Sequence, residues 1–160
     1  MSDPQFDSAR FRQVLGHFPT GVSVVASMDD GEPVGLAIGS FFSVSLEPPL
    51  VGFCVGSSSS TWPRIEAAGR FCVNVLGAHQ EGTSRTFGSK EPDKFSGIGW
   101  DRSPLGSPRI TDSIAWIDCE IDAVHEAGDH QIVVGSVHDL AVTHEGHPLI
   151  FFRGGYAGLA

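Results

Sequence analysis

The spacing of hydrophobic residues predicts a helix near the start of the chain. The apolar residues that share one side of this helix are Phe11, Val14, Leu15 and Phe18. They follow the intervals i, i+3, i+4 and i+7 that are typical of an amphipathic helix. Asp7 or Ser8 can cap its first turn, and Pro19 ends the pattern.

Beyond this helix, apolar and polar residues alternate as they do in strands. We expect one strand over residues 22–26 and a returning strand over 34–38, because the Asp30-Gly31 pair between them is typical of a tight hairpin turn. Residues 41–45 are expected to continue the returning strand after Gly39. The run Glu47-Pro48-Pro49 interrupts the pattern. The next strand should therefore begin after Pro49, which cannot donate a hydrogen bond to a sheet.

The rest of the chain predicts more strands than helices. Strands are expected at residues 50–55, 71–76, 114–124, 131–137 and 149–152, with short helices from Ser60 or Thr61 to Gly69 and over 79–87. Residues 88–108 are rich in Gly, Pro and Ser and are predicted to form a long loop. Since the strands follow one another without helical crossovers, we predict a mainly β fold, an antiparallel barrel or sandwich, in a single domain over residues 1–160.

The composition limits the partners that this domain can bind. The chain has 10 Lys and Arg against 19 Asp and Glu, which gives a formal net charge of −9. No basic run could neutralise a phosphate backbone or an anionic membrane surface, so we expect neither nucleic acid nor membrane as a partner. Cys54, Cys72 and Cys119 are scattered through apolar segments, and no secretory signal opens the chain. We therefore expect reduced thiols in a cytoplasmic protein.

Two loop segments could hold an anionic ligand. Residues 57–61 place serine and threonine hydroxyls ahead of a helix start, where free N–H groups can bind a phosphate. A solvated loop with a helix cap is the alternative. Residues 84–95 contain three of the 10 basic residues of this acidic chain. The alternative there is a helix C-terminus whose cations offset the helix dipole.

Two further segments contain single residues of interest. His130 follows a predicted turn and either stands at the rim of a barrel or bonds only within its turn. Arg153 and Tyr156 flank two glycines, and they either hold a nucleotide by charge and stacking or mark an ordinary strand end. Two histidines near residue 145 lack the cysteine or carboxylate partners of a metal site, so we predict no metal.

Taken in order, six segments resemble one family, the short-chain flavin reductases that serve as reductase components of two-component flavin-dependent monooxygenases. The segments are residues 11–22, 35–50, 71–76, 87–95, 128–130 and 153–156. The resemblance implies a split β-barrel of the flavin-reductase type that forms a homodimer, reduces FMN or FAD with NADH or NADPH, and supplies reduced flavin to a separate oxygenase. We expect NADH rather than NADPH as the reductant, because the sequence has no basic cluster that could bind the 2′-phosphate of NADPH. The alternatives are a flavin-binding split-barrel module without reductase activity and an oxidase that retains its flavin.

The same resemblance implies which residues meet the two cofactors. Those expected to contact the flavin ring, largely through the backbone, are Leu36, Ala37, Ile38, Gly39, Ser40 and Ser45. Those expected around the ribityl chain and phosphate are Cys54, Val55, Gly56, Ser57, Ser58, Ser59, Ser60 and Thr61, with Phe87, Gly88, Ser89 and Lys90 closing over the flavin. The residues expected to meet the nicotinamide nucleotide are His130, Arg153 and Tyr156. Hydride would pass directly between the two cofactors, so no residue is expected to act as an acid or base, and His130 is the candidate for orienting the nicotinamide.

Overall fold

The structure, a computed structural model, describes residue 3 and residues 5–159. The helices are α1 (Ser8–Leu15), α2 (Trp62–Ala68) and α3 (Glu81–Phe87), with a 3₁₀ turn η1 (Ala78–Gln80) before α3. The strands of the main sheet are β2 (Ser23–Asp29), β3 (Glu32–Ile38), β4 (Phe42–Leu46), β5 (Pro49–Gly56), β6 (Arg70–Val75), β9 (Ala115–Ala127) and β10 (His130–Val142). The shorter strands are β1 (Thr20–Gly21), β7 (Trp100–Arg102), β8 (Pro108–Ile110), β11 (Ile150–Phe152) and β12 (Gly155–Ala157).

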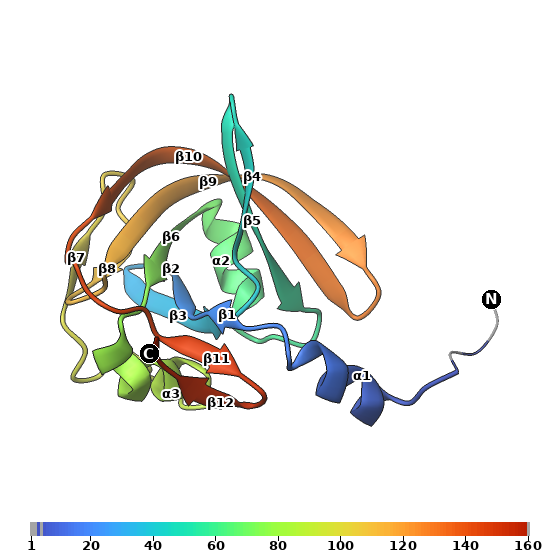
Figure 1. Cartoon of the computed structure of the whole chain (residues 1–160). Coiled ribbons are helices and arrows are strands. Elements are labelled where there is room, and N and C mark those ends of the chain that lie inside the picture. The colour runs from blue at the N-terminus through green and yellow to red at the C-terminus, as the bar shows by residue number, and fades with distance from the viewer. Residues whose placement is uncertain (1–2, 4, 160) are drawn as a thin grey trace.

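The main sheet is antiparallel throughout and has the order β3-β2-β6-β9-β10-β5-β4. It curls around α2, and the long strands β9 and β10 arch over it (Figure 1). Between the two edges of the sheet, the Ser40 hydroxyl donates to the Cys54 carbonyl at 3.0 Å and accepts from the Cys54 N–H at 2.9 Å. This pair of bonds links the segment after β3 to β5, so the curled sheet is joined there by a side chain. The predicted mainly β, antiparallel fold is confirmed.

Two hydrophobic cores stabilise the curled sheet. The first lies inside the curve, where the ring of Phe53 packs edge-on against Trp62 of α2 and Phe71 of β6. The second lies on the other side of β2 and β3, beneath α3, and includes Phe87 and Phe95. Because β3 takes part in both cores, its backbone is held at the boundary where the candidate site forms.

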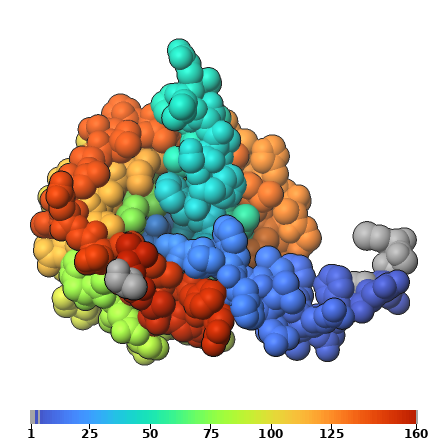
Figure 2. Space-filling model, in the orientation of Figure 1, coloured from blue at the N-terminus to red at the C-terminus, as the bar shows by residue number. Residues whose placement is uncertain are grey.

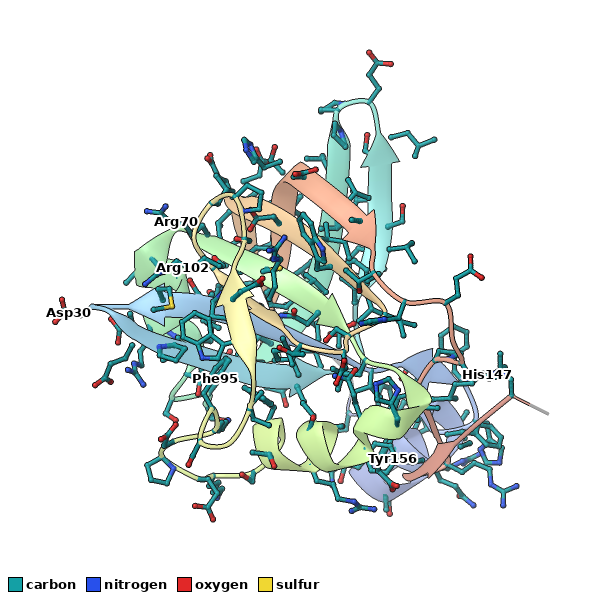
Figure 3. All side chains as sticks on the ribbon, turned by 90° about the vertical axis from the view of Figure 1, so that its left-hand side faces the viewer. Asp30, Arg70, Phe95, Arg102, His147 and Tyr156 are labelled. Atoms are coloured by element: carbon teal, nitrogen blue, oxygen red, sulfur yellow. The ribbon has the colours of Figure 1, made fainter. Side chains whose placement is uncertain are left out.

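The local elements near the N-terminus follow the sequence pattern. The carboxylate of Asp7 caps α1 by accepting from the Arg10 N–H at 2.8 Å. The turn between β2 and β3 has positive φ at Asp30 (49°) and Gly31 (83°), as a two-residue hairpin turn of this type requires. Asp30 lies at the tip of this hairpin (Figure 3). Both predictions are confirmed, but no residue of α1 is buried, so its apolar stripe stays largely exposed apart from the stacking of Phe11 on Phe6.

Other predictions of secondary structure were wrong or incomplete. Residues 42–46 do not extend β3, because β4 lies at the opposite edge of the sheet and pairs with β5. The predicted loop 88–108 contains β7, which pairs with β8 to form a small hairpin. The last strand was predicted to end at residue 152, but a further strand, β12, follows it and returns along β11. Each error concerns a pairing between segments that the local pattern does not specify.

The three cysteines are free thiols, and two of them are buried. Burial, and after it the nearby Asp118 carboxylate, raises the pKa of both Cys72 and Cys119, that of Cys119 to about 12. Both thiols therefore stay protonated near neutral pH and act as core residues. Within the described residues, no helix combines the length and hydrophobicity that crossing a membrane requires.

Candidate functional site

A cavity of about 600 Å³ opens where β3, the loop before α2 and the segment after α3 meet. The predicted flavin-contacting residues that line it are Leu36, Ala37, Ser58, Ser59, Ser60, Thr61, Phe87, Gly88, Ser89 and Lys90. Residues that lie far apart in the sequence are thus brought to one cavity by the fold. Phe95 also lines the cavity and lies beneath the β2–β3 hairpin (Figure 3).

One wall of the cavity is the serine-rich loop. Thr61 is the N-cap residue of α2, one of the two positions predicted, but its side chain forms no capping hydrogen bond. The Ser59 hydroxyl instead accepts from the Trp62 N–H at 3.1 Å. The first turn of α2 offers no free N–H, because Pro63 has none and the Arg64 N–H donates to the Thr61 carbonyl. Within the described residues, the hydroxyl and N–H groups of Ser58, Ser60 and Thr61 donate to no protein atom. Any anion binding on this wall therefore falls to the loop itself rather than to the helix start.

The opposite wall combines a close backbone approach with aromatic rings. A Cβ on Gly35 would lie 3.0 Å from Cε1 of Phe87 and 3.1 Å from the Val25 carbonyl oxygen, so this position of β3 has no room for a side chain. The rings of Phe87 and Phe95 pack edge-on with their centres 4.9 Å apart. Together these residues make this part of the cavity lining apolar.

Two cations on the cavity differ in how they are compensated. Arg64 is held by the Asp29 carboxylate, with Nε to Oδ2 at 2.5 Å, and by Glu32 at 3.8 Å. Lys94 has no carboxylate partner among the described residues. Its ammonium donates to the carbonyl oxygens of Phe87 at 3.1 Å and Gly35 at 3.5 Å. Partial burial lowers the pKa of Lys94 because it disfavours the charged form. A half-buried cation without a counter-ion would be stabilised by an anionic ligand in the cavity.

Several predicted site residues do not line this cavity. The side chain of Ile38 is in the core, and the Ser40 hydroxyl is used by the Cys54 backbone. The others outside it are Gly39, Ser45, Cys54, Val55, Gly56, Ser57, His130, Arg153 and Tyr156. The structure therefore brings together the 58–61 and 87–90 segments with part of β3 and separates them from the residues expected at the nicotinamide.

His130 lies at the start of β10, opposite Gly56 and next to the serine-rich loop. Its Nδ1 donates to Oδ1 of Asp129 at 2.7 Å, and this hydrogen bond lowers the pKa of Asp129. The ring is half exposed and lies beyond the end of the loop rather than on the cavity. The bond to Asp129 fixes which ring nitrogen carries the proton and leaves Nε2 free.

Arg153 and Tyr156 belong to another part of the surface. The Tyr156 hydroxyl bonds the Ser84 hydroxyl at 2.8 Å, and the guanidinium carbon of Arg85 lies 4.9 Å from the Tyr156 ring centre. Tyr156 is thus packed on α3, as Figure 3 shows. Arg153 lies beside the end of α1, where its N–H donates to the Gly16 carbonyl at 2.7 Å.

The sequence did not identify eight residues that line the cavity: Pro33, Val34, Gly35, Arg64, Glu91, Pro92, Lys94 and Phe95. Lys94 lay within the basic segment 84–95, so its charge was noticed but not its place in the cavity. Nothing in the sequence near Arg64 marks it, because its role depends on Asp29 and Glu32 in the hairpin opposite.

The family model described as "Flavin reductase like domain" matches residues 15–160. The chain belongs to the flavin reductase-like family. A flavin reductase of Pseudomonas putida is 55% identical over 159 residues, which cover 99% of this chain and 91% of that protein. The reductase subunit HsaB of a flavin-dependent monooxygenase from Rhodococcus jostii is 52% identical over 153 residues, 96% of this chain and 78% of that protein.

A solved relative has nearly the same fold. The NADH:FAD oxidoreductase of Streptomyces globisporus, solved in complex with NAD and FAD fragments, aligns with a TM-score of 0.92 at 37% identity and covers 100% of this chain and 96% of its own. The fold of this chain is therefore the split barrel of flavin reductases, as the sequence resemblance implied.

Proposed function

We propose that this protein reduces FMN or FAD with NADH and supplies the reduced flavin to a separate oxygenase. The observation that carries the proposal is the β3 cavity, in which unpaired hydroxyl and N–H groups face an apolar wall and an uncompensated Lys94. The names of two relatives support NADH as the reductant and a separate oxygenase as the recipient of reduced flavin. The Rhodococcus protein is named as the reductase subunit of a monooxygenase, and the Streptomyces protein as NADH-dependent.

The residues of the cavity fit a flavin nucleotide. Ser58, Ser60 and Thr61 would hold its phosphate through hydroxyl and N–H groups that have no protein acceptor. The apolar wall at Leu36 and Phe87 would hold the ring. The volume of about 600 Å³ lies in the range of small-ligand sites.

When bound, the flavin supplies a ring that accepts a hydride from the nicotinamide. The chain's part is to bind and orient. Lys94 supplies positive charge to the cavity, and the Phe87–Phe95 pair makes part of its lining apolar. His130, held by Asp129, presents Nε2 as the group that orients the nicotinamide. We place the reaction in the cytoplasm, where the three free thiols stay reduced.

The direct test is oxidation of NADH by the purified protein, followed by its near-ultraviolet absorbance, with FMN, with FAD and without flavin. We expect oxidation only when flavin is added, and slower oxidation of NADPH than of NADH. A protein that binds flavin but oxidises neither nucleotide would be a binding module, and the proposal would fail. Flavin that co-purifies and turns over without added flavin would indicate an oxidase that retains its cofactor.

His130→Ala is expected to raise KM for NADH about three- to tenfold while KM for flavin changes little, because the ring lies outside the flavin cavity. Steady-state kinetics with each substrate varied in turn measures both constants. Asp129→Asn, which weakens the hold on the ring, should cause a smaller rise in KM for NADH. Equal rises in the two constants for His130→Ala would remove His130 from this role.

We also propose that the protein is a homodimer. The apolar stripe of α1 is uncovered, with Phe11 51%, Val14 60% and Leu15 52% exposed, followed by Phe18 at 73%. The β4–β5 hairpin projects from the top of the body, and α1 extends from the body at the lower right (Figures 1 and 2). The tip of the hairpin carries Leu46 at 92% exposure. Apolar surface on this scale is typical of an interface.

Leu15→Asp is expected to convert the dimer to a monomer, because it places a charge in the α1 stripe. Light scattering coupled to size-exclusion chromatography measures the mass. Gln13→Asp, on the opposite face of the same helix, is the matched control and should remain dimeric. A wild-type protein that is monomeric at micromolar concentration, or a Leu15→Asp protein that stays dimeric, would contradict the proposal.

A further inference from the structure

A second hollow, of about 530 Å³, lies where the end of α1 meets the turn between β11 and β12. Figure 1 shows this hairpin beside α1, and Figure 2 shows the two segments in contact on the surface. The hydrogen bond from the Arg153 N–H to the Gly16 carbonyl, at 2.7 Å, joins them. The hollow shares no lining residue with the β3 cavity.

Three groups that can be positively charged line this hollow, in a chain of net charge −9. The guanidinium groups of Arg12 and Arg153 form no hydrogen bond or ion pair with any described residue. The Arg153 guanidinium lies only over the Phe152 ring, 5.5 Å from its centre. Nδ1 of His17 donates to the Gln13 carbonyl at 2.8 Å, which leaves the other ring nitrogen available. Among the residues that the structure describes, no carboxylate lines the hollow to compensate these charges.

The backbone of Arg153 adopts a conformation that is energetically unfavourable for arginine. Arg153 and Gly154 have φ values of 52° and 75° and form a two-residue turn between the paired residues Phe152 and Gly155. Such a turn favours Asn, Asp or Gly at its first position, and an arginine there is strained. A strained residue whose side chain has no partner in its own chain is a candidate for ligand binding.

We propose that this hollow binds the phosphate groups of a nucleotide diphosphate. Arginine binds phosphate through paired N–H groups, and two arginines with unoccupied guanidinium groups provide two such forks. The volume exceeds what an inorganic phosphate needs and suits a larger nucleotide.

The test is calorimetric titration of the full-length protein with ADP. Arg12→Gln and Arg153→Asn are each expected to raise the dissociation constant for ADP at least about tenfold, because each removes a charged hydrogen-bonding group. Asn suits the turn at residue 153, so Arg153→Asn should have a Tm equal to or above that of the wild type. Arg102→Gln is the matched control, since Arg102 lies on the β7–β8 hairpin and donates to the Gly106 carbonyl (Figure 3). It should bind ADP as the wild type does.

Two outcomes would overturn the proposal. One is a wild-type protein that does not bind ADP, and the other is an Arg153→Asn protein that binds it with unchanged affinity. A parallel titration with NADH identifies the source of the diphosphate. If Arg153→Asn weakens the binding of NADH as well, the hollow holds the diphosphate of the dinucleotide. If it weakens the binding of ADP alone, the hollow holds a free nucleotide. ADP binding does not require flavin reduction, so failure here would leave the proposed reductase activity to be judged by its own assay.

Discussion

Lys94→Met is expected to raise the dissociation constant for FMN at least about tenfold, since a charged hydrogen-bonding group is worth about 1.5–3 kcal/mol. Methionine keeps most of the length and apolar surface of lysine but removes a partly buried cation of the cavity that has no carboxylate partner among the described residues. Quenching of FMN fluorescence on titration with protein measures the constant. KM for flavin should rise in the same proportion.

The controls for this variant separate charge from packing. Lys90→Met removes an exposed lysine from the same cavity and should raise the dissociation constant for FMN by less than about threefold, because an exposed charge contributes little to binding. Lys94→Arg should recover most of the lost affinity. If Lys94→Met and Lys90→Met weakened FMN equally, or if Lys94→Met lowered Tm without changing affinity, Lys94 would be a structural tie between β3 and the end of α3.

Asn74→Ala is expected to lower the free energy of unfolding by about 3 kcal/mol. Asn74 is fully buried in β6, and its amide links three parts of the chain. Nδ2 donates to the carbonyl oxygens of Val24 at 3.3 Å and Pro108 at 3.1 Å, and Oδ1 accepts from the Ile110 N–H at 2.8 Å. Alanine would leave these backbone groups unpaired in the interior. Urea denaturation measures the loss.

Ser107→Ala is the matched control for this prediction. Ser107 is also fully buried in the same region, but its hydroxyl has no hydrogen-bond partner. Its loss should change the free energy of unfolding by less than about 1 kcal/mol. Equal destabilisation by the two substitutions would mean that the Asn74 hydrogen bonds do not hold β8 against β6.

The fold was predictable where neighbouring residues determine the structure. The period of apolar residues located α1 and the strands from β2 to β6, and Asp30-Gly31 marked the hairpin turn. The place of β4 was not predictable, because its pairing depends on how the sheet curls and on the Ser40–Cys54 bonds. The sequence also predicted the α1 stripe without indicating that it stays largely exposed.

The sequence identified many of the residues that line the cavity, but it did not show which of the predicted site residues lie together. The 58–61 and 87–90 segments line one cavity, as the family resemblance implied, because both flank β3. Arg153 lies instead with α1, where a hydrogen bond to Gly16 holds it. Lys94 and Arg64 could not be distinguished by sequence, since only the fold shows that Asp29 compensates one and that no carboxylate compensates the other.

The central claim is that the β3 cavity holds a flavin while NADH reduces it. The most direct measurement is the visible absorbance of FMN or FAD after anaerobic mixing with NADH and a catalytic amount of the protein. We expect the wild type to bleach the flavin over many turnovers, and Lys94→Met to do so more slowly when flavin is below saturation. If the wild type left the absorbance of both flavins unchanged in the presence of NADH, the claim would be contradicted.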